Sequence, residues 1–283
     1  MASFTNFATL SYNGGTTNSN IVTGEILEAL TAVKTAVSAN YSAGDRITYA
    51  LSLVNTGTAA ITDYTVTDNL GGYTVGANTV YPLAYNAGTV RYYINGVLQT
   101  APTVTAGPPL TVTGLTVPAG GSAVLIYETT TTPVAPLATG SSITNTATIT
   151  GGGLTNPITA QATVETANSA DLTISKALSP TTVTENSWIT YTFVISNTGN
   201  TEATATGNVV VTDTFAPILR NIAVTYNGTA WTEGTNYTYN AATGVFTTLA
   251  GQITVPAATF TQNTDGTFTV TPGTATLVIT GTV

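Results

Sequence analysis

The sequence predicts an all-β protein made of two tandem antiparallel β-sandwiches. Apolar and polar residues alternate over most of the chain, as around Tyr49, Leu51 and Leu53, which is the pattern of a strand with one buried face. Turn-forming pairs such as Asn95-Gly96 and Asn227-Gly228 interrupt these runs at short intervals. The same order of motifs occurs twice in 283 residues, a length that suits two ordinary domains.

Corresponding motifs align the two halves on either side of residue 167. The first half carries Ile47-Thr48-Tyr49, Asn55-Thr56-Gly57 and Thr67-Asp68, and the second carries Ile189-Thr190-Tyr191, Asn197-Thr198-Gly199 and Thr212-Asp213. We expect each half to be an immunoglobulin-like sandwich of about seven to nine strands. Residues 26–166 are predicted to form domain 1, and residues 167–283 an incomplete domain 2.

One segment, Glu25–Val37, has apolar residues three and four positions apart, as in a helix. The matching segment of the second half, Asp171–Leu178, alternates as a strand does. We therefore expect the first part of Glu25–Val37 to be a helical turn or linker and the second part to be a strand.

The beginning of the chain repeats a hairpin from its middle. Residues Ser3–Gly14 (SFTNFATLSYNG) match Ser142–Gly153 (SITNTATITGGG) nearly position for position. The segment Pro272–Val283 aligns with Pro118–Thr129, after which only the first half continues into the hairpin Ser142–Val164. A sandwich without its closing hairpin exposes core side chains and an unpaired strand edge, so we expect another segment to cover domain 2.

We expect residues 1–25 to form a donor hairpin that completes domain 2 of the neighbouring subunit. Each hairpin leads directly into the first strand of the domain that follows it, so its own host should be the preceding domain. The donor-strand residues would be Phe4, Asn6, Ala8, Leu10 and Tyr12. The alternative is a displaced repeat that folds back on its own chain or stays frayed.

The composition limits the function. The chain has no Cys and no His, and its 13 carboxylates are scattered, so we expect no enzyme, no metal site and no cofactor. A net charge of −8 with only 5 basic residues argues against nucleic acid as a partner. There is no apolar run long enough for membrane insertion and no visible signal peptide. We expect an extracellular protein that was processed or leaves the cell without a signal.

Both lysines occupy the same place in the repeat, and period two turns each toward the core. Asp68 and Asp213, and also Asn145 and Asn6, lie in phase with apolar neighbours in the same way. Buried polar groups need partners, so we expect two trios to be in contact. They are Lys34, Asp68 and Asn145 within domain 1, and Lys176 and Asp213 with Asn6 of the adjacent subunit.

Two interpretations of these trios remain open. In the first, Lys and Asp form an ion pair and Asn completes the hydrogen bonds. In the second, Lys and Asn form an amide and release ammonia, because burial favours the neutral, nucleophilic amine and a neutral acid that polarises the carboxamide. An amide in the second trio would link neighbouring subunits covalently.

The motifs ISKALSP, ITYTFVISNTGN, VVVTDTF and SITNTATITG resemble the conserved-repeat domain of bacterial and archaeal surface proteins, a domain of unknown function that is number eleven in its series. The resemblance covers nearly the whole chain, twice, and implies a structural role without enzymatic activity. The order of Lys, acid and Asn resembles the isopeptide-linked domains of Gram-positive pili. In the absence of a signal peptide the chain resembles spore-appendage subunits.

These observations predict a structural subunit of a pilus-like or spore-appendage-like fibre on the cell or spore surface. The partner would be the protein itself, in a homopolymer assembled head to tail by donor-strand complementation. The alternative is a monomeric adhesin stalk or ligand-binding module, whose surface ligand the sequence does not identify.

Overall fold

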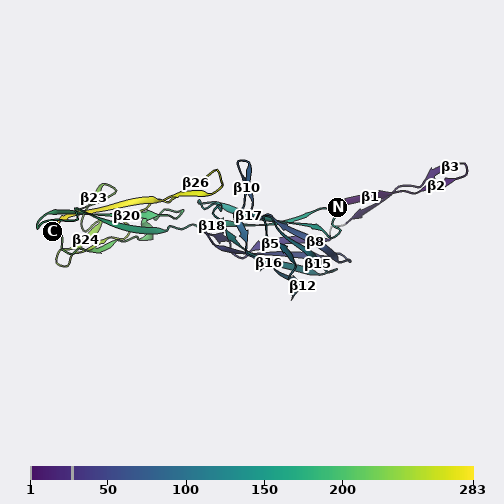
Figure 1. Ribbon diagram of the computed structural model, residues 1–283, viewed down its shortest axis with the longest axis horizontal. Coiled ribbons are helices and arrows are strands. Elements are labelled where there is room, and N and C mark those ends of the chain that lie inside the picture. Colours follow the sequence, from purple (N-terminus) through teal and green to yellow (C-terminus); the bar gives the residue numbers. More distant parts are fainter. Residues whose placement is uncertain (1, 27–28) are drawn as a thin grey trace. The chain divides into compact units, whose positions relative to one another are not determined.

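The computed structural model describes residues 2–26 and 29–283 and confirms the all-β fold (Figure 1). In these residues a single 3-10 turn, Ala205–Gly207 (η1), is the only helical element, and no helix has the length and apolarity needed to cross a membrane. The chain divides into two compact units, residues 1–135 with 142–165 and residues 136–141 with 166–283. We call them domain 1 and domain 2, and describe the N-terminal hairpin, residues 2–26, separately.

The N-terminal hairpin consists of two successive strand pairs, drawn in purple in Figure 1. These are β1 (Ala2–Asn6) with β4 (Val22–Ile26), and β2 (Thr9–Tyr12) with β3 (Gly15–Asn18). Across the described residues these strands pair only with one another, and every side chain from Ser3 to Thr23 is exposed. The helical turn expected after Glu25 is wrong for Ile26, which is in a strand, while residues 27 and 28 lie outside the described part.

Domain 1 contains two antiparallel six-stranded sheets. The first consists of β5 (Leu30–Ala36), β7 (Arg46–Asn55), β16 (Ser122–Thr131), β12 (Arg91–Ile94), β13 (Val97–Leu98) and β11 (Leu83–Tyr85), in the order β13-β12-β16-β7-β5 with β11 also on β16. The second consists of β14 (Thr103–Thr105), β15 (Leu110–Val117), β8 (Ile61–Asp68), β17 (Ser142–Gly151), β18 (Ile158–Thr166) and β6 (Asn40–Tyr41), in that order. A small hairpin, β9 (Tyr73–Val75) with β10 (Asn78–Val80), accompanies them.

The core of domain 1 is built from residues that alternate along these strands. The buried set includes Tyr49, Leu51, Leu53, Tyr64, Val66, Leu125, Tyr127, Ile143, Ala147 and Ile149. Both sheets contribute one face each, as the period-two pattern predicts for a sandwich. The second part of Glu25–Val37 is the strand β5, as expected.

Domain 2 has a five-stranded sheet and a much smaller second sheet. The first consists of β19 (Leu172–Ser179), β20 (Trp188–Asn197), β28 (Gly273–Thr282), β22 (Arg220–Tyr226) and β23 (Thr229–Trp231), in that order. The second has the order β21 (Thr212–Thr214), β25 (Val245–Thr248) and β24 (Tyr237–Asn240). A further hairpin joins β26 (Thr259–Gln262) to β27 (Phe268–Thr271).

The first sheets of the two domains pair in the same register. Lys34 of β5 lies opposite Leu51, and Lys176 of β19 lies opposite the equivalent residue Phe193. The structure corrects one alignment, because Leu277 occupies the place of Leu125 and the final strand is therefore shifted by two residues from the sequence match. A shift of two keeps the same side chains inside, so alternation alone does not detect it.

The second sheets differ at one edge. In domain 1, β8 lies between β15 and β17. The equivalent strand β21 pairs with β25 on one side, and none of the described strands lies on its other side. Domain 2 thus has an open edge where domain 1 has the hairpin β17–β18.

Candidate functional site

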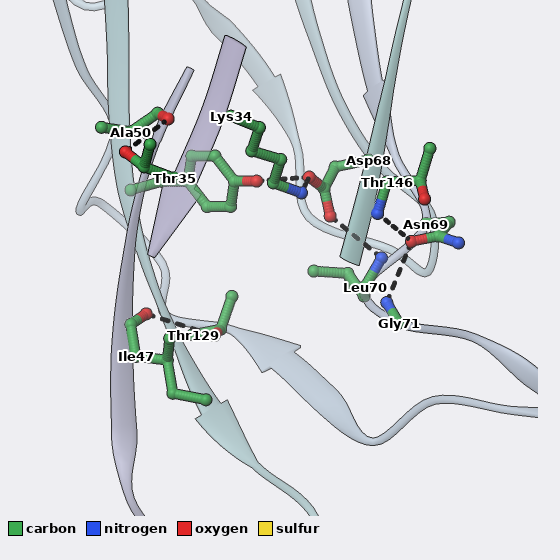
Figure 2. Close-up of polar contacts among 11 residues, drawn as sticks. Lys34, Thr35, Ile47, Ala50, Asp68, Asn69, Leu70, Gly71, Thr129 and Thr146 are labelled. Carbon is green, nitrogen blue, oxygen red and sulfur yellow. Dashed lines mark hydrogen bonds and ion pairs between the residues drawn. The ribbon is translucent and has the colours of Figure 1, made fainter. Parts of the chain in front are cut away.

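The trio predicted in domain 1 joins the two sheets of the sandwich. Lys34 comes from β5, at the edge of the first sheet, and Asp68 from the end of β8 in the second. Figure 2 shows their side chains pointing toward each other, with Lys34 Nζ 2.5 Å from Asp68 Oδ2. Their side chains are 0 % and 1 % exposed, so this is a dry ion pair.

Two tyrosines enclose this pair. The hydroxyl of Tyr127 donates a hydrogen bond to Asp68 Oδ2, and the backbone N–H of Leu70 donates to Oδ1 over 2.9 Å. Lys34 Nζ lies 4.8 Å from the ring centroid of Tyr49 and 5.8 Å from that of Tyr127. The carboxylate therefore has three donors, and the amine lies against aromatic faces that favour a cation.

Asn145 is the third residue of the trio, and its carboxamide makes no hydrogen bond of ordinary geometry. It is fully buried beside the hydroxyls of Tyr49 and Tyr127, which it influences, yet neither Oδ1 nor Nδ2 has a partner at hydrogen-bond distance and angle. Ala147 lies opposite Asp68, which places Asn145 diagonally across from Asp68 on the inward face. An unpaired buried polar group costs about 1–3 kcal/mol, so this carboxamide is held at a cost that a bond to a neighbour would remove.

Burial tunes the reactivity of the amine. It lowers the pKa of Lys34 to about 8, although the neighbouring Asp68 acts in the opposite direction. A lowered pKa increases the uncharged, nucleophilic fraction of the amine at neutral pH. Burial also raises the pKa of the Tyr127 hydroxyl well above its usual value, so that it remains a donor. The site thus contains a nucleophile, an acid-base group and an electrophilic carboxamide.

Domain 2 contains the same lysine and aspartate in a more open setting. Lys176 Nζ of β19 donates to Asp213 Oδ2 of β21 and lies 4.5 Å from the ring centroid of Tyr191. The two side chains are 40 % and 18 % exposed. The expectation that Lys176 is buried is therefore wrong for the free chain, whose second sheet in domain 2 has no described counterpart of β17 and β18.

The predicted donor-strand residues all lie on the exposed N-terminal hairpin or its connection. Phe4 and Asn6 are on β1, Leu10 and Tyr12 are on β2, and Ala8 lies between these strands. Phe4 is 54 % and Leu10 63 % exposed. Their sequence equivalents on β17, Ile143 and Ile149, are buried in domain 1. The same pattern is thus inside a sandwich in one place and in solvent in the other.

Sequence reasoning missed a second pair of repeated side chains. Asn55 and Asn197, identified only as parts of turns, are both buried. Asn55 Nδ2 donates to the carbonyls of Ala59 (2.8 Å) and Pro118 (3.0 Å), and its Oδ1 accepts from Gly57 N–H. Asn197 makes the matching bonds in domain 2. Their signal was the position of each Asn in phase with the buried residues of its strand.

The described residues contain no group of three or more Asp, Glu, His or Cys side chains that could hold a metal ion. A cavity of about 540 Å³ in domain 2 is lined by Leu219, Arg220, Glu233 and Tyr239, none of which belongs to a trio. The candidate site is therefore the pair of trios.

No family model matches the chain, and no curated protein is similar to it in sequence. The resemblance to the conserved-repeat domain therefore stays a prediction. Similar solved structures include BcpA, the major pilin subunit of Bacillus cereus, which is 14 % identical with a TM-score of 0.36, over 96 % of this chain and 73 % of that one.

Two others are the pilus backbone RrgB from Streptococcus pneumoniae and the N-terminal domain of the Streptococcus gordonii adhesin Sgo0707. RrgB is 13 % identical with a TM-score of 0.36, over 86 % of this chain and 55 % of that one. Sgo0707 is 15 % identical with a TM-score of 0.35, over 47 % of this chain and 31 % of that one, so this chain spans less than a third of its length. These TM-scores are too low to transfer any property of those proteins.

Proposed function

We propose that this protein is the structural subunit of an extracellular homopolymeric fibre on a cell or spore surface. In this fibre the N-terminal hairpin of each subunit completes domain 2 of a neighbouring subunit. The observation that carries this proposal is that two unpaired parts of the chain are complementary. Domain 2 has an open edge at β21, and the chain has an exposed hairpin with the sequence of the strand that fills the equivalent edge of domain 1.

The register of domain 1 supplies the expected docking register. There β17 pairs with β8 so that Ala147 lies opposite Asp68 and Ile149 opposite Val66. The equivalent pairing sets Ala8 opposite Asp213 and Leu10 opposite Val211. Main-chain hydrogen bonds along an added strand provide affinity, and alternate side chains provide specificity.

Apolar burial favours the same contact. Phe4 and Leu10 are exposed on the hairpin, and Ile174 and Leu178 are exposed on β19, on the side that carries Lys176. Burying each such side chain stabilises a contact by about 1.5–3 kcal/mol. The hairpin and the face of β19 therefore both expose apolar side chains, and each surface can bury those of the other.

Chain connectivity indicates that the host belongs to another subunit. The hairpin β17–β18 belongs to the domain before β19 and runs into β19 after residues 167–171. The N-terminal hairpin runs into β5 just as directly, since β4 ends at Ile26 and β5 begins at Leu30. By the same connectivity its host would stand before domain 1, and domain 2 of another copy of this chain is a domain with a matching open edge. A head-to-tail contact of this kind does not close on itself, and it produces a fibre.

Within domain 1, we propose an amide between Lys34 and Asn145 that fastens the two sheets together. The neutral amine attacks Cγ of Asn145, the bond from Cγ to the carboxamide nitrogen breaks, and ammonia leaves. Asp68 takes the proton from the attacking nitrogen and returns it to the leaving group. The carboxamide of Asn145 has no hydrogen-bond partner and lies beside Tyr49 and Tyr127, the two tyrosines that enclose the amine of lowered pKa, and this supports the step.

Two neighbouring substitutions on the hairpin test the assembly. Phe4→Asp changes the equivalent of buried Ile143, and Thr5→Asp changes the equivalent of exposed Thr144. Electron microscopy and size-exclusion chromatography should show fibres for wild type and Thr5→Asp and monomers for Phe4→Asp. A wild-type protein that stays monomeric at high concentration favours the alternative, a monomeric adhesin or ligand-binding module.

A further inference from the structure

We propose that domain 2 carries an amide-forming site divided between two subunits. The acceptor subunit contributes Lys176 and Asp213, and the donor hairpin of the other subunit contributes Asn6. The covalent linkage therefore forms only after the hairpin has docked. This inference rests on the proposed strand donation. It adds a covalent bond between subunits and an order of events, neither of which strand donation itself requires.

The acceptor half of this site is already assembled in the free chain. Lys176 and Asp213 form the same contact from the same strands as Lys34 and Asp68. The aromatic support is also present, because Lys176 Nζ lies 4.5 Å from the ring centroid of Tyr191 and 5.4 Å from that of Phe215. The carboxamide and the cover over the pair are missing, as is a counterpart of Tyr127.

The donor hairpin carries both missing parts. Asn6 lies two positions before Ala8, as Asn145 lies two positions before Ala147. Docking in the register of β17 therefore places Asn6 diagonally across from Asp213. Phe4 and Leu10, on the same alternating face, take the places of Ile143 and Ile149, which are buried in the core of domain 1.

One difference between the domains favours the incoming carboxamide. Tyr127, whose hydroxyl donates to Asp68, lies opposite Tyr49, and the residue opposite the equivalent Tyr191 is Ile279. Asp213 therefore has no tyrosine donor at this place. Its Oδ1 accepts from the N–H of Thr214 and its Oδ2 from Lys176, which leaves a further lone pair that Asn6 Nδ2 can use as an acceptor.

The covalent step balances without any co-reactant. The uncharged Nζ of Lys176 attacks Cγ of Asn6, and the bond from Cγ to Nδ2 breaks. Asp213 accepts a proton from Nζ and delivers it to the departing nitrogen, which leaves as ammonia. One amide replaces another, and the fibre gains a bond between side chains of two subunits.

Exposure sets the order of the two events. Water reaches Lys176 in the free subunit, because its side chain is 40 % exposed, and the carboxamide that it would attack lies on another subunit. Lys34 shows what the closed arrangement does, since its side chain is fully excluded from solvent. Docking supplies the cover and the electrophile together, so a subunit that has not docked does not react.

The test uses full-length chains and a mixture of two variants. Asn6→Ala has an intact acceptor and Lys176→Arg has an intact donor hairpin, so each alone should run as a monomer after boiling in SDS. Mixed, they should give a covalent dimer and no longer ladder, because only one productive pairing exists. Mass spectrometry of the digested dimer should find Lys176 joined to Asn6 with one ammonia lost. Wild type and the control Asn20→Ala, an exposed residue outside the strands, should give a full ladder.

A second donor variant checks the chemistry. Asn6→Asp should still give a ladder, but with water lost in place of ammonia, because the carboxyl group then supplies the leaving oxygen. A ladder from Asn6→Ala alone, or a mixture that gives no dimer while wild type gives a ladder, overturns the assignment of these residues.

Microscopy separates the two proposals. Wild-type fibres seen before boiling that dissolve in SDS to monomers overturn the covalent linkage and leave strand donation intact. Wild-type protein that forms neither fibres nor a ladder overturns both. Fibres together with a ladder that depends on Lys176 and Asn6 support both.

Discussion

Lys34 and Lys176 occupy the same position of the repeat, each paired with an aspartate and placed over aromatic rings, yet the side chain of Lys34 is 0 % exposed and that of Lys176 is 40 % exposed. Their own strands and registers are equivalent. The difference therefore comes from what lies over them. Domain 1 has the strands β17 and β18 in its second sheet, and domain 2 has no described counterpart.

The buried pair of domain 1 predicts an asymmetry between single and double substitutions. In an Asn145→Ala background, where Lys34 stays a free amine paired with Asp68, Lys34→Met leaves the Asp68 carboxylate buried without its cation, which should destabilise domain 1 by about 3–5 kcal/mol. Lys34→Met with Asp68→Leu removes both charges and should lose less. Urea unfolding of both variants in the Phe4→Asp background, where we expect monomers, measures the difference. A double variant as unstable as the single one contradicts the account, since neither can form the amide.

The pH dependence of stability distinguishes a free Lys34 from an amide. In Asn145→Ala the amine stays free, with a pKa lowered by burial to about 8 from 10.5. Between these values the unfolded chain binds more protons than the folded chain, so the free energy of unfolding should rise from pH 8 to about pH 10. Wild type, with Lys34 in an amide, should lack this rise.

Above about pH 10 both proteins should lose stability. Burial raises the pKa of Tyr49 and Tyr64, so the folded state keeps protons that the unfolded state releases. Thermal unfolding between pH 7 and pH 11 in the Phe4→Asp background measures both limbs. A rise of equal size in wild type shows that its Lys34 is a free amine.

The sequence was sufficient to predict the sandwich face on which each polar residue lies. Period two placed Lys34 and Asp68 on inward faces, and the structure brings them into contact across the two sheets. The hydrogen bond from the Tyr127 hydroxyl to Asp68 was not predictable, because alternation indicates which residues face inward but not which of their polar groups come into contact. The exposure of Lys176 was missed for a related reason. The position in the alternating pattern defines the face of the strand to which a side chain points, but burial also requires other residues packed over that face.

Asn55 and Asn197 should be equally important to their domains. Each substitution to Ala removes at least two donations to backbone carbonyls and an acceptance from a glycine N–H; Asn55 also donates to Val117, and Asn197 also accepts from the Asp171 N–H. We expect each to destabilise its own domain by about 2–4 kcal/mol. The exposed Asn78 is the control, and its replacement by Ala should change stability by less than about 0.5 kcal/mol. Denaturant unfolding followed by hydrogen exchange assigns each loss to a domain, and a small effect at either Asn contradicts the prediction.

A synthetic hairpin should stabilise one domain and not the other. In a chain lacking residues 2–24, a peptide of residues 2–26 with Asn6→Ala binds reversibly, because it offers no carboxamide. At a peptide concentration of 100 times Kd the stability of domain 2 should rise by about 2.7 kcal/mol. Domain 1 should not respond, since its own β17 and β18 fill the equivalent edge. Amide exchange should slow in β19 and β21, where the hairpin docks. The same peptide with Phe4→Asp should have little effect, and a shift of both domains, or of neither, would show that the hairpin does not recognise the open edge of domain 2.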